Sequence, residues 1–240
     1  MRRRRLLLAP GAPGERTPRG CGVAGVAERL AAVRDRIERA GGDPDRITII
    51  AVTKRQPEGA VGAAVAAGIV DVGENYAQEV LAKAATAPSG VRWHFLGQVQ
   101  RNKVKVLAPV VTLWHGVDRV AVIDAIAARA PGAAILVEVN TSGEPGKAGC
   151  GIGSTPEVVA HARSAGLEVR GLMTVAPQGD AEDARGAFRQ LARLRDELAL
   201  VELSMGMSGD LEIAVEEGAT IVRIGTALFG PRPVHARVRR

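Results

Sequence analysis

Residues 133–140 read AAILVEVN, and this nearly continuous apolar stretch decides the fold class. A strand that does not alternate apolar and polar side chains is buried on both faces, as in parallel sheets that helices cover. Other short apolar runs rich in β-branched residues precede and follow it, and segments of helical periodicity separate them. This alternation of strand and helix is typical of α/β proteins.

The pattern predicts eight strands, near residues 47–53, 69–72, 92–96, 111–114, 134–140, 169–173, 201–204 and 221–224. Helices are predicted between them, near residues 57–67, 75–86, 99–107, 118–130, 155–165, 181–198 and 209–217. A doubly wound sheet alternates in the same way. Eight strands nevertheless favour a closed (β/α)₈ TIM barrel, because closure leaves no exposed sheet edge.

Residues 26–42, VAERLAAVRDRIERAGG, predict an extra helix before the first strand, and Gly41 and Gly42 end it. We therefore expect one barrel domain over residues 23–230. Residues 1–22 are expected to form a disordered, Arg-rich N-terminal extension, and residues 231–240 a basic C-terminal tail.

The net charge of +6 comes from the two ends of the chain, since residues 1–20 hold six Arg and one Glu and the last ten residues hold four Arg. The part between them has a small acidic excess, so we expect no nucleic-acid partner, although basic tails can bind polyanions. No apolar run is long enough for a signal peptide or a membrane span. With only two cysteines, the sequence predicts a soluble, cytoplasmic protein.

Polar residues gather where the predicted strands end, which is the face that carries the active site in such barrels. Lys54 ends the first strand, and the last two strands lead into SMGMS (204–208) and Gly225-Thr226. Barrels often bind phosphate in those two loops, where glycines let the backbone approach and hydroxyl and N–H groups donate. A lysine facing a phosphate site suggests an aldehyde-bearing cofactor, and pyridoxal 5'-phosphate (PLP) is the common one.

Simpler interpretations of the same residues stay open at this point. A lysine at a strand end is often a solvated charge, SMGMS is often only a turn, and His94 is often a core histidine. His115 and Asp118 could open a helix, with Asp118 as its N-cap. The four histidines show no metal-ligand spacing, so no metal site is predicted.

Taken together, seven segments resemble one family, the PLP homeostasis proteins (YggS/PROSC, or PLPBP), which are relatives of the alanine racemase N-terminal domain. The segments are AVTK (51–54), GENYAQE (73–79), WHFLGQVQRNK (93–103), NTSGEPGKAG (140–149), GLM (171–173), LSMGMSGDLEIAVEEG (203–218) and VRIGTALFG (222–230). They run in order over residues 23–230. Three positions depart from the family pattern: Thr53 stands where Ser is usual, Val72 where Phe is common, and Gly209 where an acid is common.

The resemblance implies an alanine racemase N-terminal-type barrel that binds PLP as a Schiff base on Lys54. It implies that the residues around the phosphate are Ser204, Gly206, Met207, Ser208, Gly225 and Thr226. It further implies that Arg223 lies near the pyridine nitrogen and that Asn75, His94 and Met173 contact the ring.

An arginine beside the pyridine nitrogen cannot take up a proton at neutral pH, which disfavours transaminase-type chemistry. Racemases also need a second acid or base, and the one tyrosine, Tyr76, belongs to an early segment. We therefore predict a monomeric, non-catalytic PLP carrier or buffer, with PLP-dependent apo-enzymes as recipients.

Three alternatives belong to other classes. The first is a weak amino-acid racemase or lyase that uses Lys54 as its base. The second is a barrel enzyme that binds another phosphate compound, and the third is a nucleic-acid-binding module that uses the Arg-rich ends.

Overall fold

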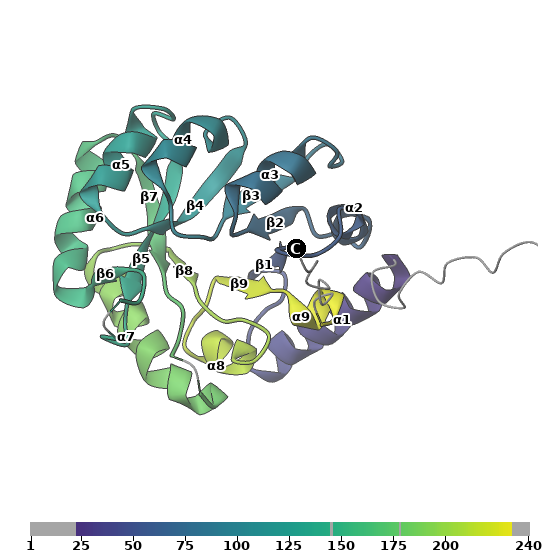
Figure 1. Cartoon of the computed structure of the whole chain (residues 1–240). Helices are drawn as coiled ribbons and strands as arrows, with labels where there is room; N and C mark the ends of the chain where they lie inside the picture. Colours follow the sequence, from purple (N-terminus) through teal and green to yellow (C-terminus); the bar gives the residue numbers. More distant parts are fainter. Residues whose placement is uncertain (1–22, 145, 178, 232–240) are drawn as a thin grey trace, which may run out of the picture.

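Eight parallel strands close into a barrel in the computed structural model, which describes residues 23–144, 146–177 and 179–231 (Figure 1). The barrel strands are β1 (Thr48–Val52), β2 (Asp71–Glu74), β3 (Arg92–Phe95), β4 (Val111–Val117), β5 (Ala134–Asn140), β7 (Glu168–Met173), β8 (Glu202–Ser204) and β9 (Ile221–Ile224). Pairing of β4 with β5, and of β1 with β9, completes the ring. The predicted TIM barrel is confirmed. A short extra strand, β6 (Cys150–Gly151), pairs with β5 and is too brief for sequence periodicity to reveal.

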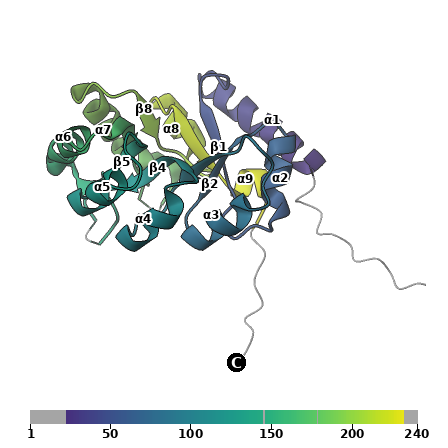
Figure 2. The same cartoon turned by 90° about the horizontal axis from the view of Figure 1, so that it is seen from above.

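Helices surround the barrel; the first precedes β1, and the others follow strands in sequence. They are α1 (Val23–Arg39), α2 (Gly59–Ala66), α3 (Ala77–Ala84), α4 (Arg101–Leu107), α5 (Val120–Ala127), α6 (Thr155–Ser164), α7 (Ala184–Glu197), α8 (Leu211–Glu216) and α9 (Thr226–Phe229), with 3₁₀ turns η1 (Ile152–Ser154) and η2 (Ala181–Asp183). The predicted extra helix is α1, which buries Val26, Val33 and Ile37 and packs against α2, α8 and α9 (Figure 2).

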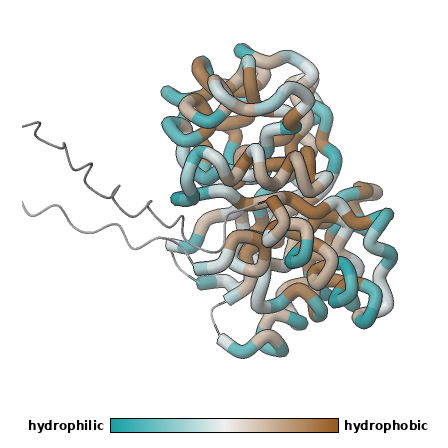
Figure 3. The backbone as a smooth tube through the Cα atoms, turned by 90° about the vertical axis from the view of Figure 1, so that its right-hand side faces the viewer, coloured by the Kyte–Doolittle hydropathy of each residue, from teal (hydrophilic) through white to brown (hydrophobic). Residues whose placement is uncertain are grey.

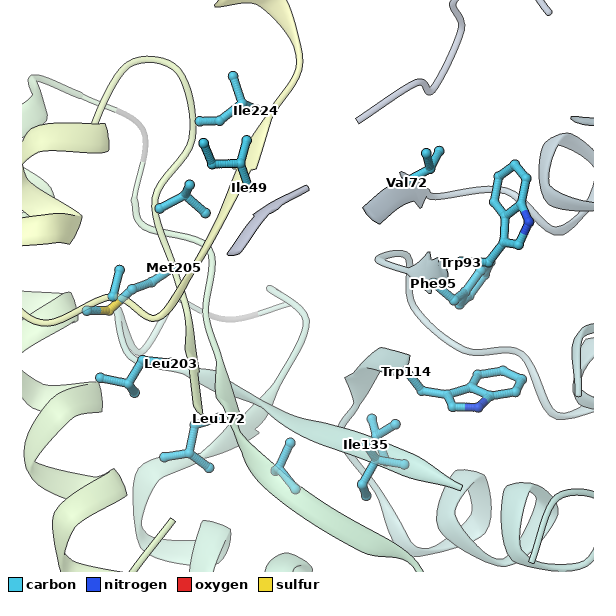
Figure 4. Packing of buried hydrophobic residues seen from close by; sticks show 14 of the residues in the cluster. Ile49, Val72, Trp93, Phe95, Trp114, Ile135, Leu172, Leu203, Met205 and Ile224 are labelled. Atoms are coloured by element: carbon cyan, nitrogen blue, oxygen red, sulfur yellow. The ribbon is translucent and has the colours of Figure 1, made fainter. Parts of the chain in front are cut away.

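The alternation of side chains along each strand creates two cores. Trp93, Phe95, Trp114, Leu172 and Leu203 project from their strands toward the helices, where they form the larger core (Figure 4). Hydrophobic segments accordingly run through the interior of the molecule, while hydrophilic ones lie mostly at its periphery (Figure 3). Successive side chains of a strand point to opposite faces, so the neighbours of these residues point into the barrel.

The inward-facing side chains form a second, smaller apolar cluster. Its members are Ile50, Val52, Leu96, Leu113, Ala134, Leu136, Met173 and Ile221. Gly73 belongs to the same layer, because a Cβ there would lie 2.5 Å from Leu96 Cδ1 and 2.8 Å from Ile50 Cγ2. The barrel is therefore packed below its mouth, and its remaining inward positions carry the polar groups described next.

Two strands extend farther than the sequence pattern predicts. β2 includes Glu74, whose charge is paired inside the protein, and β4 runs through His115 to Val117. The alternative in which Asp118 caps the next helix is wrong, because the N-cap of α5 is Arg119 and the Asp118 carboxylate accepts a hydrogen bond from its guanidinium. Polar residues occupy these strands because their partners lie on neighbouring strands and helices, which periodicity does not reveal.

The predicted N-terminal extension, residues 1–22, lies outside the described residues, as does the C-terminal tail from residue 232. Within the described ranges, no helix is both long and apolar enough to cross a membrane.

Candidate functional site

Lys54 lies in the turn that follows β1, and it is half-buried. Ile50 and Val52 of β1 point into the barrel, and Lys54 follows two residues after the carboxyl end of that strand. The neighbouring Thr53 faces the other way, since its hydroxyl donates to Glu74 Oε1 at 2.6 Å in the layer between strand and helix. The structure thus puts the predicted amine at the carboxyl end of the barrel.

A buried ammonium group holds the backbone on one side of Lys54. Lys83 of α3 donates to the backbone oxygen of Thr53 at 2.6 Å, to Glu74 Oε1 at 2.6 Å and to Glu79 Oε2 at 2.9 Å. The Lys83 side chain is 5% exposed and that of Glu74 is fully buried. Burial raises the pKa of Glu74, and the hydrogen bond from Lys83 opposes that rise.

The same cluster holds the other side of the turn. Glu79 Oε2 accepts the backbone N–H of Arg55 at 2.8 Å. Arg55 has φ +57°, the left-handed conformation that a non-glycine residue adopts only at some cost. Lys83, Glu74 and Glu79 therefore act as a clamp, here called the Lys83 clamp, on both peptide neighbours of Lys54.

The two loops predicted to bind phosphate lie together. Ser208, after β8, accepts the backbone N–H of Ala227, after β9, at 3.1 Å. Gly206 has φ +89°, and a Cβ there would lie 2.4 Å from Ala214 Cβ, so only glycine fits this turn. The backbone N–H of Met207 donates to Asp210 Oδ1 at 2.5 Å, so Asp210 braces the loop in front of α8 and makes no side-chain cap. Gly225 and Thr226 begin α9 beside this loop.

Arg223 is buried in the barrel below these loops. Its Nη1 donates to the backbone oxygen of Ser204 at 2.7 Å and to Ser204 Oγ at 2.8 Å, and its Nη2 donates to the backbone oxygen of Thr174 at 2.8 Å. Burial lowers the pKa of Arg223 to about 10, so the guanidinium remains charged at neutral pH. The site therefore contains a cation, held in place by three hydrogen bonds, that can donate hydrogen bonds but cannot accept them.

Ser204, predicted to contact phosphate, has its hydroxyl inside the barrel, where it meets Arg223 and also His115 Nδ1 at 3.0 Å. His94, predicted to contact a ring, is buried with both nitrogens engaged, Nδ1 with His115 Nε2 and Nε2 with Asp71 Oδ1, each at 3.0 Å. Met173 is buried in the inner apolar cluster. These roles toward a cofactor stay predictions.

Asn75 precedes α3 and lines a pocket of about 390 Å³ between the loops that follow β2 and β3. Tyr76, Gln100 and Lys103 line the same pocket. The close approach of these loops requires Gly97, since a Cβ there would lie 2.2 Å from the backbone oxygen of Asn75.

Sequence reasoning missed Glu138, an inward-facing carboxyl group on β5. It is 5% exposed, and its Oε2 has no hydrogen-bond partner in the structure. Burial raises its pKa to about 7, with a further contribution from Asp118, while Arg223 opposes the rise. The signal was present in AAILVEVN, where Glu138 is the one charged residue of an apolar strand.

Glu138 should make stability fall as pH rises. A carboxyl group whose pKa is about 7 in the folded chain and 4.5 when unfolded binds more protons when folded. The contribution of Glu138 to the free energy of unfolding is therefore fully present below about pH 4.5 and is lost as the pH rises through 7. The loss amounts to at most about 3 kcal/mol for such a shift. Urea unfolding between about pH 5 and pH 8 measures it, and Glu138→Gln should flatten the profile. An unchanged slope in that variant contradicts the assignment.

Among the described residues, no cluster of His, Cys, Asp and Glu could hold a metal ion. The functional groups brought together at the mouth are thus an amine, a buried guanidinium and two adjoining loops of glycines and hydroxyl residues. They suit an organic anion with a group that reacts with amines.

Comparison with known proteins agrees with this chemistry. The family model for the alanine racemase N-terminal domain matches residues 26–233. A pyridoxal phosphate homeostasis protein of Pseudomonas aeruginosa is 41% identical over 218 residues, covering 86% of this chain and 94% of that protein. One of Aquifex aeolicus is 42% identical over 224 residues, covering 86% of this chain and 98% of that protein.

Solved structures show the same architecture. PipY of Synechococcus elongatus, determined with PLP bound, has a TM-score of 0.75 and 34% identity, covering 85% of this chain and 100% of its own. Alanine racemase of Corynebacterium glutamicum has a TM-score of 0.71 at 14% identity and covers 90% of this chain and 64% of its own. The second likeness concerns the fold alone.

Proposed function

Because the chain belongs to the pyridoxal phosphate homeostasis protein family, we propose that it holds PLP as a Schiff base on Lys54 and serves as a carrier and buffer of that cofactor. The observation that carries the proposal is the position of Lys54 at the mouth of the same barrel whose last two loops supply anion donors. A relative of 34% identity, PipY, has been solved with PLP bound.

The donor set fits such a group. Lys54 offers a primary amine, and Ser208, Thr226 and the backbone of Gly206 and Gly225 offer hydroxyl and N–H donors for a phosphate, while the Met207 N–H donates to Asp210. Arg223 is the cation that would face the pyridine nitrogen. Asn75 adds an amide at the rim of the mouth.

When bound, PLP supplies an aldehyde that condenses with amines and a ring that can withdraw electrons. Lys54 Nζ would form a carbon–nitrogen double bond with the aldehyde carbon, and its two hydrogens would leave with the aldehyde oxygen as water. Arg223 keeps its proton at neutral pH and can only donate, so it would leave a pyridine nitrogen that faced it unprotonated. Such an arrangement would weaken electron withdrawal and favour storage of the cofactor over turnover.

The test is retention of PLP without turnover by the full chain. We expect PLP to remain with the protein through gel filtration and to appear in an added PLP-dependent apo-enzyme as recovered activity. Incubation of the loaded protein with L- and D-alanine or serine should give no racemisation or elimination above that of free PLP. Sustained turnover would instead establish a racemase or lyase that uses Lys54 as its base.

A further inference from the structure

A chain of buried hydrogen bonds crosses the inside of the barrel and ends at Arg223. From β2 to β9 its members are Asp71, His94, His115, Ser204 and Arg223. Each step between them measures 2.8–3.0 Å, and His115 and Ser204 are fully buried. We call this set the barrel relay. The fold does not require polar side chains at these inward-facing positions, because apolar side chains would fill the same layer of the barrel.

The two ends of the barrel relay constrain the direction of its hydrogen bonds. Arg223 can only donate, so Ser204 Oγ accepts from it, and the hydroxyl hydrogen of Ser204 is available for His115 Nδ1. At the other end, hydrogen bonds from His94 and Arg92 outweigh burial and lower the pKa of Asp71, which therefore accepts as a carboxylate. His94 Nε2 must then carry a hydrogen.

The middle step concerns the tautomer of His115. Burial together with the nearby His94 and Arg223 lowers the pKa of His115 well below its usual value, so its ring is neutral and has one N–H. With His94 Nε2 donating to Asp71, we infer that this N–H lies on Nε2 and points at His94 Nδ1, which leaves Nδ1 of His115 to accept from Ser204. Every donor then meets an acceptor from Arg223 to Asp71.

We propose that His115 and His94 are positioning residues that orient Arg223 through Ser204. Because His115 accepts the hydrogen bond from the Ser204 hydroxyl, Ser204 Oγ presents only lone pairs to the guanidinium. Arg223 then donates to Ser204 Oγ and to the backbone oxygens of Ser204 and Thr174. Three acceptors fix the plane of the cation. The role of this orientation toward PLP rests on the function proposed above, whereas the direction of the relay does not.

The same geometry gives two predicted contact residues a second role. Ser204 and His94 act on Arg223 through the barrel relay, and their predicted contacts with the phosphate and the cofactor ring stay predictions. Both side chains have their polar atoms engaged with protein partners in the described structure.

Long-range ¹H–¹⁵N NMR of imidazoles in the full, PLP-free chain tests the direction. We expect His94 and His115 both to carry their hydrogen on Nε2, with Nδ1 unprotonated. His161, which pairs with Asp124 at 2.8 Å on the surface, supplies the matched control, and His161→Asn assigns its signals. A hydrogen on Nδ1 of His115 would overturn the proposal even if PLP binds normally.

Two substitutions test the positioning role. His115→Asn keeps an acceptor for the Ser204 hydroxyl, while His115→Phe removes it. We expect about tenfold weaker PLP retention and a shifted absorbance band of bound PLP in His115→Phe, with both restored in His115→Asn. Equal behaviour of the two variants, or no spectral shift in His115→Phe, contradicts the role. Failure of the unmodified chain to retain PLP would count against the proposed function and leave the NMR result standing.

Discussion

Lys54→Ala should abolish covalent trapping of PLP. Borohydride reduces a Schiff base to a stable amine, so the unmodified chain incubated with PLP should yield one modified peptide, the one that contains Lys54. The variant lacks the amine that follows strand β1 at the carboxyl end of the barrel. We expect its trapped fraction to fall to background, and the visible absorbance of the Schiff base to disappear with it.

Lys105→Ala is the matched control, because Lys105 is an exposed lysine of α4 on the outside of the barrel. Its trapping should equal that of the unmodified chain. Peptide mass spectrometry after reduction identifies the site in every sample. Undiminished trapping in Lys54→Ala, at whatever other lysine, would overturn the assignment of the Schiff base.

Lys83→Met should cause the largest loss of stability. The substitution removes the cation that faces Glu74, whose side chain is fully buried and has one oxygen, Oε2, without a hydrogen-bond partner. Breaking a buried ion pair on one side typically costs about 3–5 kcal/mol, since it leaves an uncompensated charge. Urea unfolding of the PLP-free chain measures the change in the free energy of unfolding.

The double variant Glu74→Leu with Lys83→Met separates charge from packing. Replacement of both partners of a buried pair by apolar groups is often nearly neutral, so much of the lost stability should return. Arg189→Met, which removes an exposed partner of Glu217, should cost far less than Lys83→Met. A double variant no more stable than Lys83→Met would show that the Lys83 clamp stabilises through something other than charge.

The apolar runs predicted the barrel because they report local burial. Residues 134–140 and 221–224 were predicted with the bounds that β5 and β9 have. At the carboxyl ends of the strands the largest errors, two and three residues, fall where polar residues extend β2 and β4, at Glu74 and from His115 on. The bounds of a strand there depend on partners that lie elsewhere in the chain.

Some residues of the candidate site could likewise be predicted from the sequence, and others could not. Lys54 and the loops around Gly206 and Gly225 could be predicted, because the carboxyl ends of barrel strands carry function and these residue types suit an anion. Glu138 could have been noticed as a charge within an apolar strand. The Lys83 clamp could not, because a lysine on a short helix gives no sign of burial in its sequence.

The sequence by itself determined eight strands, their order along the chain and the residues at their carboxyl ends, since each depends on periodicity within a few residues. Only the tertiary structure decided which polar side chains meet inside the barrel. His115 and Ser204 are 89 residues apart and lie on β4 and β8, two strands that are not neighbours in the sheet. Closure of the barrel brings them within hydrogen-bonding distance, because it turns the inward faces of all eight strands toward one axis.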